Sequence, residues 1–141
     1  MRILLTNDDG VASPGLAAVH EELAAYGCHE IWVVAPEHEQ SGMSHSITLK
    51  DPIRSRQLEE RKFAISGSPA DCVMTAVLGI MPEKPELVIS GINLGPNLGT
   101  DLIYSGTAAA ARQAAYMGIA GVAVSINAFG PPWNFSALAQ F

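Results

Sequence analysis

The feature that most constrains this fold is the alternation of short apolar runs with segments that carry helix signals. The run RILLT at 2–6 is followed by a polar turn and then by a helix signal from Ser13 to about Tyr26, where Gly27 ends it. The next run, EIWVVA at 30–35, is too uniformly apolar for a strand with one face in water, which is typical of a parallel strand covered on both sides. The alternation predicts a right-handed parallel sheet with helices on both faces.

Further elements continue this order along the chain. The first helix has an apolar stripe at steps of three and four, made of Leu16, Val19, Leu23 and Tyr26. After it we expect a polar loop at 36–45, two or three less buried strands with an antiparallel excursion within 46–66, a helix at 68–80, a strand at 86–91, a long loop at 92–106, a helix to Gly118 and a strand at 122–126. Long loops in a compact domain are usually functional.

Composition confines the chain to one globular domain. Hydrophobic residues make up 48% of its 141 residues and charged residues 16%, which is enough apolar material for one core and too little charge for a disordered chain. The formal charge of −6 has no basic run to offset it, so the sequence predicts no large nucleic acid as partner. A small phosphorylated ligand stays open, because a metal ion or a helix terminus can supply positive potential locally.

Cysteine usage and hydropathy predict a cytoplasmic protein. Cys28 and Cys72 lie far apart and match neither a disulfide framework nor a zinc motif, so a reducing compartment is expected. No run approaches the ~18 apolar residues of a membrane span, and the start of the chain lacks a signal sequence, so no membrane partner is expected. The last segment, 130–141, begins an amphipathic helix pattern and stops without a cap, so we expect one domain over 1–141 that is truncated at this end.

Two adjacent carboxylates, Asp8 and Asp9, directly follow the first apolar run. Like charges this close repel each other, and a divalent cation removes that repulsion. Carboxylate oxygens are the ligands that Mg²⁺ and Mn²⁺ prefer. The alternative is that one of the two forms an Asx turn or a cap ahead of Gly10, and the motif alone leaves both interpretations open.

Polar residues at the ends of the other strands are further candidates. The helix that opens at Ser105, Gly106 and Thr107 has an alanine-rich first turn suited to an anion, or a capping serine with nothing bound. Asn93 and Asn97 either bind a metal or substrate or only stabilise their loop. The same alternatives hold for Ser41, Ser44 and His45 in the 36–45 loop, where a histidine beside a phosphate could act as a general acid.

These candidates are expected to converge on one crevice, because ligands of parallel sheets bind beyond the carboxyl ends of the strands. Two common nucleotide-binding motifs are absent from the sequence. Neither GxxxxGK[ST] nor GxGxxG occurs, which removes the main support for P-loop hydrolysis and for dinucleotide binding.

Four motifs in this order resemble the SurE family of metal-dependent 5′/3′-nucleotidases: MRILLTNDDG, VVAPEHEQSGMSHSIT, SGSPADC and SGINLGPNLGTDLIYSGT. The resemblance covers almost the whole chain. It implies a three-layer α/β/α sandwich with a mostly parallel, Rossmann-like sheet. It also implies a phosphomonoesterase that acts on nucleoside 5′- and 3′-monophosphates with Mn²⁺ or Mg²⁺.

The resemblance also assigns residues. It implies metal ligands at Asp8, Asp9, Ser41 and Asn93, with the two aspartates catalytic. It implies phosphate contacts at Ser105, Gly106 and Thr107, with Asn97 in the same loop. Family members continue further and form dimers or tetramers, so a homodimer or homotetramer is expected for a complete chain.

The chemistry leaves two alternatives. Water attacks the phosphorus directly, or an aspartate first forms a phosphoenzyme; direct attack is favoured because metal ligation occupies the carboxylate. The rival to an enzyme is a sensor that binds a metal and a nucleotide without turnover.

Overall fold

The computed structural model describes residues 1–27, 30–128, 130–135 and 139. Its elements, in chain order, are β1 (Arg2–Thr6), α1 (Pro14–Ala25), β2 (Glu30–Pro36), β3 (Ser55–Glu59), β4 (Lys62–Ile65), α2 (Pro69–Thr75), a π-helical turn (Ala76–Ile80), β5 (Leu87–Asn93), a 3₁₀ helix (Gly99–Ile103), α3 (Gly106–Tyr116) and β6 (Ala120–Ser125).

The strands form one sheet in the order β3-β4-β2-β1-β5-β6. All neighbouring pairs are parallel except β3 and β4, which form an antiparallel pair at one edge. From β1 the chain moves outward through β2 to β4, and it then returns to place β5 on the other side of β1. This reversal between β1 and β5 is the position where open α/β sheets bind ligands.

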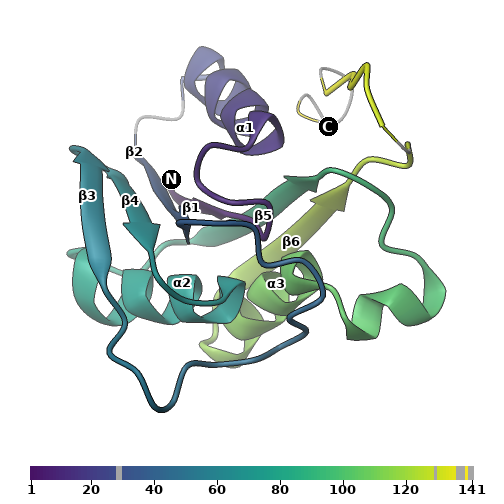
Figure 1. The fold of residues 1–141 in the computed structure, drawn as a ribbon. Helices are drawn as coiled ribbons and strands as arrows, with labels where there is room; N and C mark the ends of the chain where they lie inside the picture. The colour runs from purple at the N-terminus through teal and green to yellow at the C-terminus, as the bar shows by residue number, and fades with distance from the viewer. Residues whose placement is uncertain (28–29, 129, 136–138, 140–141) are drawn as a thin grey trace.

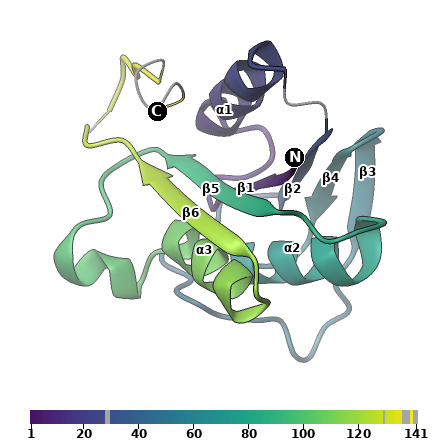
Figure 2. The same cartoon turned by 180° about the vertical axis from the view of Figure 1, so that it is seen from behind.

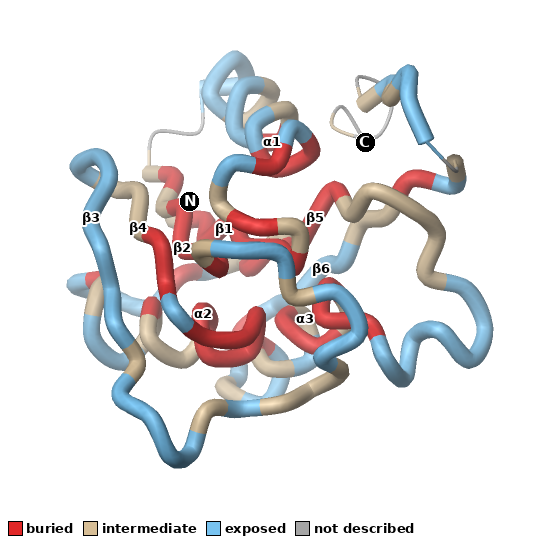
Figure 3. Tube along the Cα trace, viewed as in Figure 1, coloured by how far each residue is buried: buried red, intermediate tan, exposed pale blue. Residues whose placement is uncertain are grey.

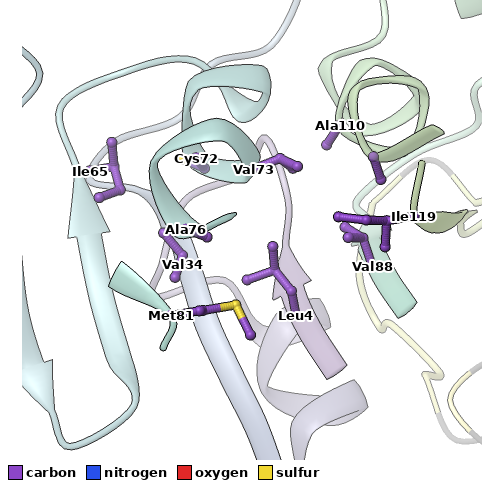
Figure 4. Close-up of a cluster of buried hydrophobic side chains, with 11 residues drawn as sticks. Leu4, Val34, Ile65, Cys72, Val73, Ala76, Met81, Val88, Ala110 and Ile119 are labelled. Atoms are coloured by element: carbon purple, nitrogen blue, oxygen red, sulfur yellow. The ribbon is translucent and has the colours of Figure 1, made fainter. Parts of the chain in front are cut away.

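Helices cover both faces of the sheet, which confirms the expected α/β/α sandwich. Helix α1 lies on one face, and α2 and α3 lie side by side on the other (Figures 1 and 2). Strand β1 has apolar side chains on both of its faces, because Leu4 packs toward α2 and α3 while Ile3 and Leu5 pack toward α1. On the α2 and α3 side, Leu4 meets Val73 and Ala110 in a fully buried cluster (Figure 4).

Four local expectations are corrected by the structure. Helix α1 ends at Ala25, so Tyr26 lies beyond its last turn and is 72% exposed, outside the buried stripe. The run 46–49 is not a strand, because buried Asp71 accepts hydrogen bonds from the backbone and hydroxyl of Thr48 and fixes it as a loop.

Helix α2 changes to π-helical geometry at Ala76 instead of continuing as one helix. Strand β5 extends to Asn93, into the expected loop.

The central strands β1, β2 and β5 are mostly buried, whereas the edge strand β3 is exposed and the loop at 94–104 is half-buried or exposed (Figure 3). Trp133 and Phe135 pack against the α1 side of the sheet. Residues 130–135 of the expected terminal helix are not helical, and residues 136–138 and 140–141 lie outside the described residues. Cys28 also lies outside them, while Cys72 is a buried free thiol. Among the helices that the structure describes, none has the length and apolarity needed to cross a bilayer.

Candidate functional site

The candidate site lies where β1 and β5 end side by side. Asp8 and Asp9 follow β1, and Asn93 is the last residue of β5. The hydroxyl oxygen Oγ1 of Thr107 lies 2.6 Å from Asp8 Oδ1 and 3.1 Å from Asn93 Oδ1. One hydroxyl is therefore within hydrogen-bonding distance of both oxygens, so three elements distant in sequence bring these groups together, as expected.

Asp8 is a buried carboxylate at the start of α3. It is 4% exposed, and burial raises its pKa. The Thr107 hydroxyl opposes that increase, as do backbone amides that include those of Gly106 and Thr107 at the helix N-terminus. The N-terminus of α3 thus already faces an anion, which is the side chain of Asp8.

Asp9 is half-buried and faces more negative charge. Burial and then the charge of Asp8 raise its pKa to about 6, with a smaller contribution from Glu39. The amide of Leu94, 3.3 Å from Asp9 Oδ2, acts in the opposite direction. A bound divalent cation would relieve this repulsion and favour the ionised carboxylate.

Ser41 lines a cavity together with Asp9 and Asn93, but its hydroxyl is hydrogen-bonded to Glu39. The cavity measures about 490 Å³, and its lining includes Asp9, Ser41 and Asn93. The exposed Ser41 hydroxyl donates to Glu39 Oε1 at 2.8 Å. The loop itself is fixed beside β1 because the amide of Gln40 donates to the carbonyl oxygen of Asp8 at 2.7 Å. Sequence reasoning missed Glu39, although its place two residues before Ser41 in a polar loop could have indicated it.

The chemistry of the donors fits a hard divalent cation. Mg²⁺ and Mn²⁺ take carboxylate, amide and hydroxyl oxygens as ligands. The site offers these through Asp8, Asp9, Asn93 and Ser41. Within the described ranges, no three histidine, cysteine, aspartate or glutamate side chains gather into a cluster that could hold a metal. A cation here would therefore need the neutral oxygens of Asn93 and Ser41 as well as the two carboxylates.

The residues expected to contact phosphate divide into two groups. Gly106 and Thr107 face Asp8, and a Cβ atom at Gly106 would lie 2.9 Å from Asp8 Cβ. Ser105 caps α3, because its hydroxyl oxygen accepts from the amide of Ala108 at 3.0 Å. Asn97 donates to Ser125 Oγ at 2.7 Å and shares with Ser105 the lining of a separate cavity of about 250 Å³.

The remaining sequence candidates have structural partners. Asn7, which precedes the two aspartates, exchanges hydrogen bonds with Gly10 and so closes the turn after β1. Ser44 donates to the carbonyl oxygen of Ile103 at 2.7 Å and so joins two loops. His45 lies 2.9 Å from Gln113 Oε1 and its ring stacks on Tyr116, outside the lining of the 490 Å³ cavity.

Comparison with known proteins gives consistent matches. The family model "Survival protein SurE" matches residues 3–141. The chain is 49% identical over 141 residues to 5′-nucleotidase SurE of Geotalea uraniireducens (strain Rf4), covering 100% of this chain and 56% of the relative. It is 50% identical over 131 residues to 5′-nucleotidase SurE of Methylobacterium radiotolerans, covering 92% of this chain and 51% of the relative.

A solved structure of the same family has a similar fold. The crystal structure of the SurE protein from Aquifex aeolicus superposes with a TM-score of 0.92 at 39% identity, covering 99% of this chain and 56% of that one. The chain spans about half the length of the curated relatives it matches.

Proposed function

The chain belongs to the survival protein SurE family, and from this premise we propose that it carries a metal-dependent phosphomonoesterase site for nucleoside 5′- and 3′-monophosphates. The observation that carries the proposal is the meeting of Asp8, Asp9 and Asn93 at the reversal of the sheet, with Thr107 joining Asp8 to Asn93. The relatives compared above are named 5′-nucleotidase SurE, which supports the reaction class.

Asp8, Asp9, Asn93 and Ser41 would hold Mn²⁺ or Mg²⁺ in this site. When bound, such a cation polarises the phosphoryl oxygens and favours ionisation of a water. Ser41 would have to turn from Glu39 to contribute its hydroxyl oxygen, and its exposed position allows that rotation.

The side chains of this protein would orient the site and exclude a covalent route. Thr107 donates to Asp8, so this carboxylate is held in one orientation and is not free to attack phosphorus. Asp8 is also buried beneath the start of α3. We therefore favour direct attack by water over a phosphoenzyme on Asp8.

Substrate contacts and cellular context belong to the same proposal. The family resemblance supports assignment of four residues to the phosphate side of the substrate: Asn97, Ser105, Gly106 and Thr107. Gly106 and Thr107 lie beside Asp8, while Asn97 and Ser105 line the separate cavity of about 250 Å³. A cytoplasmic location is a further part of the proposal and rests on cysteine usage and hydropathy. Self-association as a homodimer or homotetramer is another part and rests on the family resemblance.

The test is release of inorganic phosphate from purified chain with a nucleoside 5′-monophosphate and Mn²⁺, repeated with the 3′-monophosphate and with EDTA. Turnover that requires the cation supports the proposal. Calorimetric binding of Mn²⁺ and nucleotide without phosphate release would identify a sensor and overturn the assignment as an enzyme.

A further inference from the structure

Ser13, immediately before α1, has a buried hydroxyl that the proposed chemistry does not use. The residue is 7% exposed, and its Oγ has no hydrogen-bond partner within the part of the chain that the structure describes. A buried hydroxyl without a partner costs on the order of 1–3 kcal/mol. Ser13 is part of the lining of the 490 Å³ cavity together with Asp9, Ser41 and Asn93, so its side chain borders the space that a ligand would occupy.

The N-terminus of α1 also differs from those of the other two α-helices described. The hydroxyl oxygen of Ser68 caps α2 and that of Ser105 caps α3. Ser13 occupies the same position before α1 in extended geometry, but its hydroxyl makes no capping hydrogen bond. The first turn of a helix leaves its amides without intrahelical partners, so these amides of α1 remain available as donors.

The same contrast holds for the anions at these helix starts. The start of α2 contains the Asp71 carboxylate, and the start of α3 faces the Asp8 carboxylate. The first turn of α1 contains no acidic residue. Because Pro14 has no amide hydrogen, the donors of this turn are the amides of Gly15 and Leu16, and no hydrogen bond described for residues 1–27 occupies either of them.

We propose that Ser13 and the first turn of α1 bind an oxyanion, namely a non-bridging oxygen of the substrate's phosphoryl group. This inference rests on the proposed function for the identity of that substrate. The phosphoryl group would lie between α1 and the Asp9 and Asn93 side of the cavity. A hydroxyl and a helix N-terminus are both suited to a phosphate oxygen.

Charge in the cavity determines when this contact forms. Glu37 and Glu39 line it as well as Asp9, so the cavity repels an anion by itself. A divalent cation on the carboxylates offsets that charge, and phosphate binding at α1 should therefore require it. Ser13 should in turn affect phosphate affinity and leave cation affinity unchanged.

The experiment measures binding of inorganic phosphate to the whole chain by calorimetry at saturating Mg²⁺, for wild type, Ser13→Ala, Ser13→Gly and Ser13→Thr. Loss of a hydrogen bond to a charged acceptor should weaken phosphate binding about tenfold in the alanine and glycine variants. Glycine is itself a good residue before a helix, so it separates loss of the hydroxyl from loss of the helix start. Threonine keeps the hydroxyl and should restore affinity.

Ser46→Ala is the matched control, because Ser46 Oγ is also buried without a partner but Ser46 does not line this cavity. It should bind phosphate as wild type does. Unchanged phosphate affinity in both Ser13→Ala and Ser13→Gly would overturn the inference, as would an equal loss of Mg²⁺ affinity. Absence of phosphate binding to wild type at saturating Mg²⁺ would also overturn the inference. If wild type binds phosphate through Ser13 but releases none from a nucleoside monophosphate, the proposed function fails and the inference stands.

Discussion

Asp8 and Asp9 are neighbours in the sequence but have different surroundings. Asp8 is fixed by Thr107 beneath the start of α3, whereas Asp9 faces the open cavity with Glu39 nearby. The first is therefore suited to hold a cation in one position. The second carries most of the electrostatic repulsion that a cation would relieve.

Replacement of Asp8 by asparagine keeps the shape of the side chain and removes one charge. We expect phosphate release at saturating Mn²⁺ to fall by a factor on the order of 10² or more, equivalent to roughly 3 kcal/mol of barrier. Circular dichroism serves as the folding control. A folded variant with turnover near that of wild type would show that Asp8 is neither an essential ligand nor a nucleophile.

The raised pKa of Asp9, about 6, predicts a pH dependence of cation binding. A protonated carboxyl binds cations poorly, so Mn²⁺ affinity should rise as pH increases from 5 to 7 and then level off. Calorimetric titration of wild type and Asp9→Asn tests this, because the variant should bind more weakly and lose the dependence near pH 6. Affinity equal to wild type at pH 7 would remove Asp9 from the ligand set.

The same shift predicts how stability of the cation-free chain varies with pH. The folded state binds the Asp9 proton more tightly than the unfolded state, so the free energy of unfolding falls as pH rises from 3.8 to above 6. A pKa raised from 3.8 to about 6 corresponds to about 3 kcal/mol of unfolding free energy. Because Asp9 is partly in contact with solvent, the expected loss of stability is smaller, about 1–2 kcal/mol. Asp9→Asn should be more stable than wild type at pH 7 without cations, as measured by urea unfolding.

Among the elements, the start of α3 packs directly against Asp8, and the candidate site depends on this close packing. A Cβ atom at Gly106 would meet Asp8 Oδ2 at 3.0 Å and Pro69 Cγ at 3.0 Å. Gly106→Ala should therefore displace α3 or Asp8 and weaken Mn²⁺ binding at least about tenfold.

Gly79→Ala is the control for Gly106→Ala. Gly79 also lies in a helical turn, but nothing lies within 4 Å of the Cβ that the substitution adds. Calorimetry should give wild-type Mn²⁺ affinity for this variant. Equal affinities for both variants would contradict the proposed contact between α3 and Asp8.

At the same scale, the sequence predicted elements better than the contacts between them. Apolar runs and serine-proline starts identified β1, β2, α1 and α2, because these signals act within a few residues. The loop at 46–49 resembled a strand, and only its contact with distant Asp71 determines its shape. For the same reason the sequence indicated Thr107 as a phosphate contact but not as the partner of both Asp8 and Asn93.

At the scale of the whole molecule, the expected metal ligands come together only in the folded state, where the strand order reverses between β1 and β5. Residues 8, 41 and 93 are far apart in the chain, so an unfolded chain has no such site. Cation binding and folding are therefore linked, and a cation that binds only the folded state raises the melting temperature.

The size of this linkage can be measured. Mn²⁺ at a hundredfold excess over its Kd should add about 2.7 kcal/mol to the free energy of unfolding. For a chain of this length that corresponds to a rise in Tm of about 8 °C. Differential scanning calorimetry at pH 7.5 should show this rise in wild type and in Gly79→Ala. The rise should be much smaller in Asp8→Asn at the same Mn²⁺ concentration, because that variant retains the fold but loses a charged ligand. An equal rise in wild type and in Asp8→Asn would place the cation elsewhere on the molecule.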